Sequence, residues 1–211
     1  MGDMKDVRDM EKLLGRAARA DVSKAAARAS GSLAERAAHE QLLDVAYTTL
    51  DSPVGPVLVA ATRRGIVKIS FGALYDEESV LADLCDRVSP RVVEVPSYFD
   101  AVRTELEEYF HGRRTRFDLP LDWSLTGGFG RRVLERTARI PYGEVSTYRE
   151  VAAAAGSPRG ARAAGNALGA NPIPIVVPCH RVLHSGGGLG GYGGGIDRKE
   201  FLLKLEGAIR D

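Results

Sequence analysis

The chain is organised around the stretch Asn171-Pro172-Ile173-Pro174-Ile175-Val176-Val177-Pro178-Cys179-His180-Arg181-Val182. Each of its three prolines lacks an amide hydrogen and fixes the backbone angle φ, so the stretch is predicted to be extended or turn-rich and not helical. The thiolate is the nucleophilic form of cysteine, and cationic neighbours in a partly closed site are expected to lower the thiol pKa from its usual value of about 8.5. Because a core strand rarely leads straight into Cys-His-Arg, Cys179 is predicted to be a reactive residue and not a packing residue.

Length and composition indicate a globular protein of one large or two small domains. The chain has 211 residues, of which 44% are hydrophobic, enough to bury a core. No apolar run is long enough to cross a bilayer, and the charged N-terminus lacks the apolar core of a secretory signal. The two cysteines are Cys85 and Cys179, and no Cys/His cluster has zinc spacing. We therefore expect a cytoplasmic protein with no disulfide, metal, cofactor or membrane partner.

Charge is distributed unevenly along the chain, although the net charge is only +1. Residues 1–128 hold 17 basic and 21 acidic residues, whereas residues 129–211 hold 12 and 7. The part that contains Cys179 is therefore the basic part. Mild local basicity is compatible with nucleic-acid contact but does not by itself establish it.

The first two of three expected segments span residues 1–125. Residues 1–44, rich in Ala, Arg, Glu and Asp, are predicted to be a helical or disordered extension, with a basic arm on DNA as the alternative. Residues 45–125 are predicted to form an α/β domain whose strands make an antiparallel meander. The expected strands cover 45–49, 57–60 and 66–71, the expected helices 76–88 and 97–110, and an edge strand or connector 117–121. Helical periodicity places Cys85 on the buried face of the first helix.

The third expected segment, residues 126–211, is mostly helical. Helices are predicted over 129–140, 148–155, 157–169 and 197–207, the last with Phe201, Leu202 and Leu205 facing inward. Thr147 and Glu150 have capping-box spacing, and Ser157-Pro158 has the pattern of a second helix start. Two short helices joined by a glycine-containing turn resemble a helix-turn-helix. Small side chains in the second helix permit either tight core packing or close approach to a DNA groove.

Residues 186–195 are dense in glycine. They do not form a nucleotide-phosphate motif, because they lack the Lys-Ser/Thr pair of a P-loop and precede no Rossmann unit. Glycines here either let backbone amides approach a ligand closely or make a flexible surface loop.

The motif Pro178-Cys179-His180-Arg181-Val182 resembles the signature of the O6-alkylguanine-DNA alkyltransferases, also called methylated-DNA–protein-cysteine methyltransferases. Further segments fall at the spacing of that family: 140–148, 161–165, 171–172, 190–195 and 199–206. The resemblance is densest over residues 129–207. Over residues 45–128 it implies the ribonuclease-H-like α/β domain of the family. Leu134, Gly130 and Gly191 depart from the residues that are usual there.

The resemblance implies direct-reversal DNA repair in a single turnover. An O6-alkylguanine, and by extension an O4-alkylthymine, is flipped out of the duplex into a pocket. Cys179 attacks the alkyl carbon and keeps it as a thioether. By resemblance, His180 takes the thiol proton through a water and Glu206 orients that histidine. Tyr148 resembles the residue that protonates guanine N3 and helps to rotate the nucleotide.

The same resemblance implies contacts with double-stranded DNA, bound by a monomer that acts alone or clusters along the duplex. Arg162 resembles the finger that enters the base stack from the minor groove, and Asn171 the hinge that ties the turn to the reactive loop. Weaker correspondences suggest backbone contacts by Arg149, Ser157 and Ser185. The implied substrate pocket contains Val182, Tyr192, Gly193 and Lys199.

Two other functions compete with this interpretation. The first is a non-catalytic damage sensor of the alkyltransferase-like kind, which carries tryptophan where this chain has Cys179. The second is a cysteine hydrolase, although adjacent Cys and His have poor geometry for a direct dyad.

Overall fold

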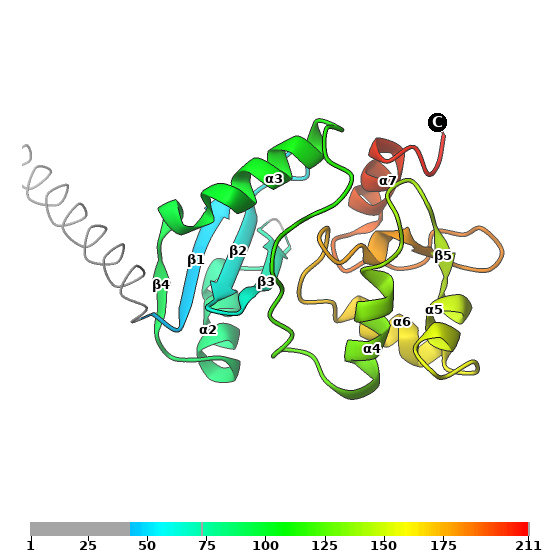
Figure 1. Ribbon diagram of the computed structural model, residues 1–211, viewed down its shortest axis with the longest axis horizontal. Helices are drawn as coiled ribbons and strands as arrows, with labels where there is room; N and C mark the ends of the chain where they lie inside the picture. Colours follow the sequence, from blue (N-terminus) through cyan, green and yellow to red (C-terminus); the bar gives the residue numbers. More distant parts are fainter. Residues whose placement is uncertain (1–42, 73, 211) are drawn as a thin grey trace, which may run out of the picture. The chain divides into compact units, whose positions relative to one another are not determined.

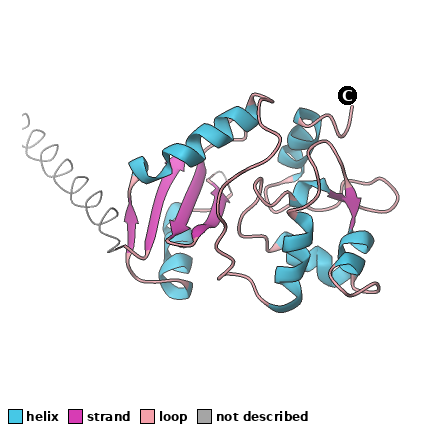
Figure 2. Cartoon of the chain, in the orientation of Figure 1, coloured by secondary structure: helices cyan, strands magenta, loops and turns pink. Residues whose placement is uncertain are grey.

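The computed structural model describes residues 43–72 and 74–210, so nearly all of the extension predicted over residues 1–44 lies outside the described residues. The first part of the described chain builds a four-stranded sheet (Figure 1 and Figure 2). Its strands are β1 (Val45–Leu50), β2 (Val57–Thr62), β3 (Gly65–Phe71) and β4 (Val92–Glu94).

The strand order is β3-β2-β1-β4. β1 and β3 both pair antiparallel with β2, which confirms the predicted meander. β4 pairs parallel with β1 and is absent from the sequence prediction. It has only three residues, between Pro90 and Pro96, which is too few to show a strand pattern. The sheet is therefore mixed and not purely antiparallel.

Two helices pack on this sheet. α2 (Glu77–Arg87) begins at Asp76, whose carboxylate accepts a hydrogen bond from the Ser79 amide. It buries Val80 and Leu84 against side chains of the strands, among them Val45, Leu58, Ala60 and Val67. Cys85 is only partly buried, so its predicted place in the core is wrong: it lies at the border of the buried face.

The second helix starts as a 3-10 turn, Pro96–Phe99, and continues as α3 (Asp100–Phe110). The predicted helix over 97–110 therefore begins in the tighter geometry that Pro96 allows at a first turn. α3 buries Val102, Leu106 and Tyr109. Tyr109 is the residue of this helix that matters for the functional site.

The segment after α3 returns to the sheet edge. The Ile66 amide donates to the Pro120 carbonyl across 2.8 Å, and the Asp122 amide donates to the Ile66 carbonyl across 2.8 Å. The predicted strand or connector over 117–121 is thus a connector with one parallel bridge between Ile66 and Leu121. Gly65, with φ of +130°, permits this approach because a Cβ there would collide with the Pro120 backbone.

The second part is mostly helical, as predicted (Figure 2). Its helices are α4 (Gly128–Thr137), α5 (Tyr148–Ala154), α6 (Ala161–Gly169) and α7 (Ile196–Leu205). A 3-10 turn, Cys179–Arg181, leads into β6 (Val182–Leu183), which pairs parallel with β5 (Ser146–Thr147). The capping box of α5 is confirmed: the Thr147 hydroxyl accepts from the Glu150 amide, and the Glu150 carboxylate accepts from the Thr147 amide.

Two local predictions in this part are wrong. Ser157-Pro158 does not start a helix, since α6 begins at Ala161. The Ser157 amide donates to the Ala152 carbonyl and the Gly156 amide to the Ala153 carbonyl, with Gly156 at φ +86°. This is a Schellman ending of α5, so Ser157 closes one helix instead of opening the next. In α7, Phe201 is 38% exposed, and Leu203 is buried beside Leu202 in its place.

Within the described ranges, no helix combines the length and apolar character that a membrane span requires.

Candidate active site

The segment between α6 and Cys179 is compact and irregular, as its prolines predict. Residues 172–175 are buried, and Ile175 adopts φ of +72°, a left-handed conformation that a β-branched residue rarely takes. The Cys179 amide donates to the Val177 carbonyl across 2.8 Å. Such strain persists only where the surrounding structure enforces it, and here it shapes the approach of the chain to Cys179.

Asn171 fixes this segment to the cysteine. Its side-chain amide donates to the Val177 carbonyl across 2.8 Å and to the Cys179 sulfur across 3.0 Å. Its side-chain oxygen accepts from the Ile173 amide across 3.0 Å. One side chain thus orients both the backbone before the cysteine and the sulfur itself.

Cys179 lines a cavity of about 480 Å³ together with residues of the two short helices and the glycine-rich loop. Five residues that the sequence singled out line it together: Cys179, Tyr148, Arg162, Tyr192 and Gly193. Cys179 is only 7% exposed, and a second cavity of about 460 Å³ also has Cys179 in its wall. The small residues of α6 also have a clear use, because Ala161, Gly165 and Gly169 form part of the wall of the first cavity.

Tyr148, the first residue of α5, presents its phenol to the cavity. The ring packs against the imidazole of His184 with centroids 5.1 Å apart, and the hydroxyl lies 3.5 Å from the Gly191 carbonyl. Burial raises the pKa of Tyr148, with a smaller contribution from Cys179, so the phenol remains a proton donor. His184 lines the same cavity and was not predicted.

The glycines of the 186–195 loop are needed where the loop passes these rings. A Cβ on Gly190 would lie 2.7 Å from the Tyr148 hydroxyl oxygen, and Gly190 has φ of +70°. A Cβ on Gly194 would lie 2.5 Å from the Tyr192 ring and 2.7 Å from the Phe71 ring. Close packing explains these two positions, in place of a merely flexible surface loop.

The expected lowering of the Cys179 pKa is wrong. Burial raises the pKa to about 11, and the Asn171 hydrogen bond and the charge of Lys199 only partly oppose it. Arg181, the cationic residue two positions after Cys179, does not face the sulfur. The Arg181 guanidinium instead grips Glu206, with Nε–Oε2 at 2.7 Å and Nη2–Oε1 at 2.8 Å. The thiol therefore needs a proton acceptor to become a nucleophile at neutral pH.

His180 and Glu206 form a buried pair next to the cysteine. His180 Nε2 lies 3.0 Å from Glu206 Oε1, and both side chains are fully shielded from solvent. Burial lowers the pKa of His180, although Glu206 opposes the shift. Burial alone would raise the pKa of Glu206, but hydrogen bonds from His180 and Arg181 outweigh it and hold that pKa at about 2.

These charges define the tautomer of His180. A charged Glu206 accepts a hydrogen bond from the Nε2–H group of a neutral imidazole. The proton therefore stays on Nε2, and Nδ1 is left unprotonated as an acceptor. Within residues 43–72 and 74–210, Nδ1 is buried and has no hydrogen-bond partner. A buried ring nitrogen of this kind is suited to receive a proton through a bridging water.

Lys199 and Val182 do not line the cavity, although both were predicted to be pocket residues. Lys199 is fully buried, and its ammonium donates to the Val182 carbonyl across 2.7 Å and also to the Leu189 carbonyl. Burial lowers the pKa of Lys199 to about 8. The Lys199 ammonium thus connects β6, which follows the cysteine, to the glycine-rich loop.

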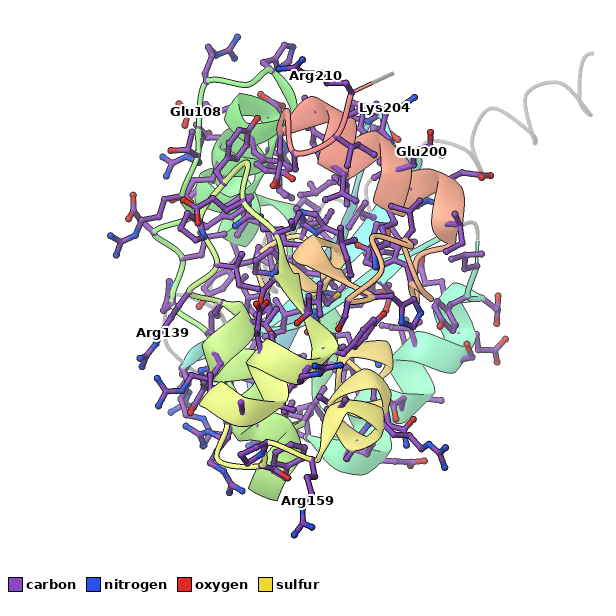
Figure 3. All side chains as sticks on the ribbon, turned by 90° about the vertical axis from the view of Figure 1, so that its right-hand side faces the viewer. Glu108, Arg139, Arg159, Glu200, Lys204 and Arg210 are labelled. Atoms are coloured by element: carbon purple, nitrogen blue, oxygen red, sulfur yellow. The ribbon has the colours of Figure 1, made fainter. Side chains whose placement is uncertain are left out.

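The predicted DNA-contacting residues separate into two groups. Arg162 is exposed and lines the cavity. Arg149 and Ser185 are exposed and Ser157 is half-buried, and none of them lines it. Figure 3 shows the Arg159 side chain pointing outward from the turn between α5 and α6, with Arg139 projecting beyond the end of α4.

Besides His184, two further residues of the site were not predicted from the sequence. Arg181 stands beside His180 in the signature, so its adjacency was visible but its ion pair with Glu206 was not. Tyr109 donates its hydroxyl to Glu206 from 97 positions away, and no local pattern signals such a contact. No group of three or more His, Cys, Asp or Glu side chains in the described part of the chain is placed to hold a metal ion.

Comparison with known proteins adds independent findings. Residues 45–123 match the family described as "6-O-methylguanine DNA methyltransferase, ribonuclease-like domain". Residues 128–208 match the one described as "6-O-methylguanine DNA methyltransferase, DNA binding domain". The methylated-DNA–protein-cysteine methyltransferase of Methanosarcina barkeri is 41% identical over 160 residues, covering 76% of this chain and 96% of that protein.

Two solved structures have the same arrangement. The O6-methylguanine methyltransferase of Mycobacterium tuberculosis is 40% identical with a TM-score of 0.67, covering 79% of this chain and 95% of that one. The OGT of the same organism in complex with DNA is 40% identical with a TM-score of 0.67, covering 77% of this chain and 93% of that one.

Proposed function

This chain belongs to the 6-O-methylguanine DNA methyltransferase family, and we propose that it transfers alkyl groups from O6 of guanine in duplex DNA to Cys179. One observation carries the proposal: Cys179 lines a cavity of about 480 Å³ whose wall also holds Tyr148 and Arg162 from the paired short helices. That cavity lies within the range reported for small-molecule sites, as a flipped base requires.

The proposed reaction begins when the damaged nucleotide leaves the base stack and enters the cavity. Arg162, exposed at the cavity rim, fills the space that the base vacates. Tyr148 meets the base from α5, with its phenol held between His184 and the Gly191 carbonyl. The exposed Arg149, Arg159 and Ser185 are suited to phosphate contacts on either side.

The chemical step exchanges one bond for another. The sulfur of Cys179 attacks the alkyl carbon, so an S–C bond forms as the O6–C bond breaks and guanine leaves. The thiol proton passes through a water to Nδ1 of His180, whose resulting charge Glu206 stabilises across 3.0 Å. Tyr148 donates a proton to guanine N3, so the proton that the thiol loses is balanced by the one that guanine gains.

The product is a thioether, which thiol exchange does not reverse. Each protein molecule therefore acts once. Because a free thiol is consumed and both Cys85 and Cys179 are unpaired, we expect the protein to work in a reducing compartment such as the cytoplasm.

The proposal is tested with duplex DNA that contains one O6-methylguanine. Wild-type protein should restore guanine with one equivalent of protein per lesion. Cys179→Ala should keep the affinity for the duplex and restore none. Cys85→Ala is the matched control, because it removes the other cysteine, which lies outside the site, and it should repair as the wild type does. Repair by Cys179→Ala, or binding without repair by the wild type, would reject the transfer.

A further inference from the structure

The carboxylate of Glu206 has a partner outside the segment that carries the cysteine and histidine. Tyr109 in α3 donates its hydroxyl to Glu206 Oε1 across 2.6 Å, and both groups are buried. α3 lies within residues 45–123, the part that matches the ribonuclease-like domain. The hydrogen bond therefore links that domain directly to the reactive centre.

The environment of Tyr109 keeps this donor in place. The residue has no exposed surface, and its ring contacts those of Phe110, Phe117 and Tyr142 at centroid distances of 5.3, 5.2 and 6.0 Å. Burial raises the pKa of Tyr109 far above its usual value, with a further contribution from the charge of Glu206. The hydroxyl is therefore protonated at neutral pH and acts as a donor toward Glu206.

Tyr109 and His180 share one oxygen atom. Glu206 Oε1 accepts from Tyr109 at 2.6 Å, from Arg181 Nη2 at 2.8 Å and from His180 Nε2 at 3.0 Å. Each donor draws electron density from the carboxylate. The hydrogen bond from Tyr109 therefore weakens the stabilisation that Glu206 gives to the protonated imidazole of His180. It also fixes the direction in which Oε1 faces His180.

Other titratable and charged groups surround His180 and Glu206. Arg181 faces both members of the pair, and Lys199 from α7 acts on His180. Tyr192 meets His180 edge-on at 6.4 Å, and Tyr142 lies near Glu206 and Arg181. None of these interactions involves the Tyr109 hydroxyl, so the effect of removing that hydroxyl can be isolated.

We propose that Tyr109 is a positioning residue for the alkyl transfer: its hydroxyl orients Glu206 and moderates the basicity of His180. The inference rests on the proposed function, because it gives His180 the part of proton acceptor. It gives the ribonuclease-like domain a direct part in the chemistry, because α3 supplies one of the hydrogen-bond donors that set the proton affinity of His180. His180 is the acceptor of the proton relay, in which the Cys179 proton passes through a water to this histidine.

The test compares Tyr109→Phe with Tyr142→Phe. Tyr109→Phe keeps the ring and removes only the bond to Glu206. Tyr142→Phe is the matched control: it removes a hydroxyl from the same aromatic cluster, but that hydroxyl donates to the Leu205 carbonyl at 3.0 Å and not to Glu206. Thermal unfolding of both variants verifies that they are folded.

Two readouts follow the relay itself. The first is the titration of the His180 ring nitrogens by NMR. The second is the single-turnover rate of alkyl transfer at saturating duplex between about pH 5 and pH 9. In Tyr109→Phe, His180 should titrate at a pH higher by about half a unit or more, since a hydrogen bond to a charged group is lost. The acid limb of the rate profile should shift to higher pH by the same amount. The transfer rate should therefore fall about threefold or more at pH values below the His180 pKa and change little at pH about 8.

A merely structural role for Tyr109 gives a different pattern. It would lower the rate by the same factor at every pH and leave the His180 titration unmoved, and that outcome overturns the inference. An equal shift in Tyr142→Phe also overturns it. Wild-type protein that fails to alkylate Cys179 in the same assay instead rejects the proposed function, so the two failures are distinguishable.

Discussion

The side-chain amide of Asn171 donates a hydrogen bond to the Cys179 sulfur across 3.0 Å. The same amide holds the Val177 carbonyl, so one residue governs both the position of the sulfur and its charge. In a site where burial raises the thiol pKa to about 11, this donor opposes the shift and favours the developing thiolate.

Asn171→Ala should therefore slow the transfer more than it weakens DNA binding. Loss of a hydrogen bond to a developing charge is worth about 1.5–3 kcal/mol, which corresponds to roughly a ten- to hundredfold lower single-turnover rate. Rates at saturating duplex, with affinities measured in parallel, check this. Asn171→Asp should be at least as slow, because its carboxylate repels the thiolate. A variant rate within twofold of the wild type contradicts the role.

The pH profile of the transfer distinguishes a relay from direct attack by a pre-formed thiolate. With the thiol pKa raised to about 11 by burial, only a very small fraction of the molecules holds a thiolate at pH about 7. Direct attack would make the rate rise about tenfold per pH unit up to that value. The relay needs neutral His180 and a protonated thiol together. Its rate should rise through the lowered pKa of His180 and then stay level until the thiol titrates.

Single-turnover rates from about pH 5 to pH 10 decide between these two profiles. A level region above the His180 pKa supports the relay. A continuous tenfold rise per pH unit contradicts it.

Gly194→Ala should damage the pocket through packing. The added Cβ would lie 2.5 Å from the Tyr192 ring and 2.7 Å from the Phe71 ring, so at least one ring must move. Overpacking of this kind costs about 1–3 kcal/mol of folding free energy. Urea unfolding measures that cost, and the transfer rate should fall because Tyr192 lines the cavity.

Gly186→Ala is the control in the same loop, because its Cβ would meet nothing within 4 Å. It should change the free energy of unfolding by less than about 0.5 kcal/mol. Equal effects of the two substitutions would reject the packing role of Gly194.

Arg162→Ala should slow repair of duplex DNA far more than reaction with free O6-benzylguanine. A free base does not have to be extracted from a stack, so the finger adds nothing to its reaction. Arg139→Ala is the matched control: this exposed arginine lies beyond the end of α4, does not line the cavity and has no proposed DNA contact (Figure 3). Equal losses of Arg162→Ala on both substrates would remove Arg162 from the flipping step.

The sequence predicted those features that local chemistry determines. The irregular stretch before Cys179, the capping box of Thr147 and Glu150, and the meander of β1 to β3 all follow from neighbouring residues. The start of α6 was missed because Ser157 fits a helix start and a helix end equally well, and only the Ala152 carbonyl decides between them.

Features that depend on residues far apart in the chain could not be predicted from the sequence. The Cys179 pKa was expected to be low because Arg181 follows closely, yet the fold directs that guanidinium to Glu206 and buries the thiol. Lys199 falls in a motif, but its burial behind the loop depends on the Val182 and Leu189 carbonyls. The bond from Tyr109 to Glu206 spans 97 positions, a distance at which no spacing rule applies.

The transfer of the alkyl group to Cys179 can be followed by mass analysis of the peptide that contains this residue, after incubation with duplex DNA carrying one O6-methylguanine. If Cys179 accepts the methyl group, this peptide gains one methyl group per lesion repaired, the peptide with Cys85 gains none, and a second equivalent of DNA is left unrepaired. Repair with an unmodified Cys179, or continued turnover on fresh DNA, would contradict the transfer to Cys179.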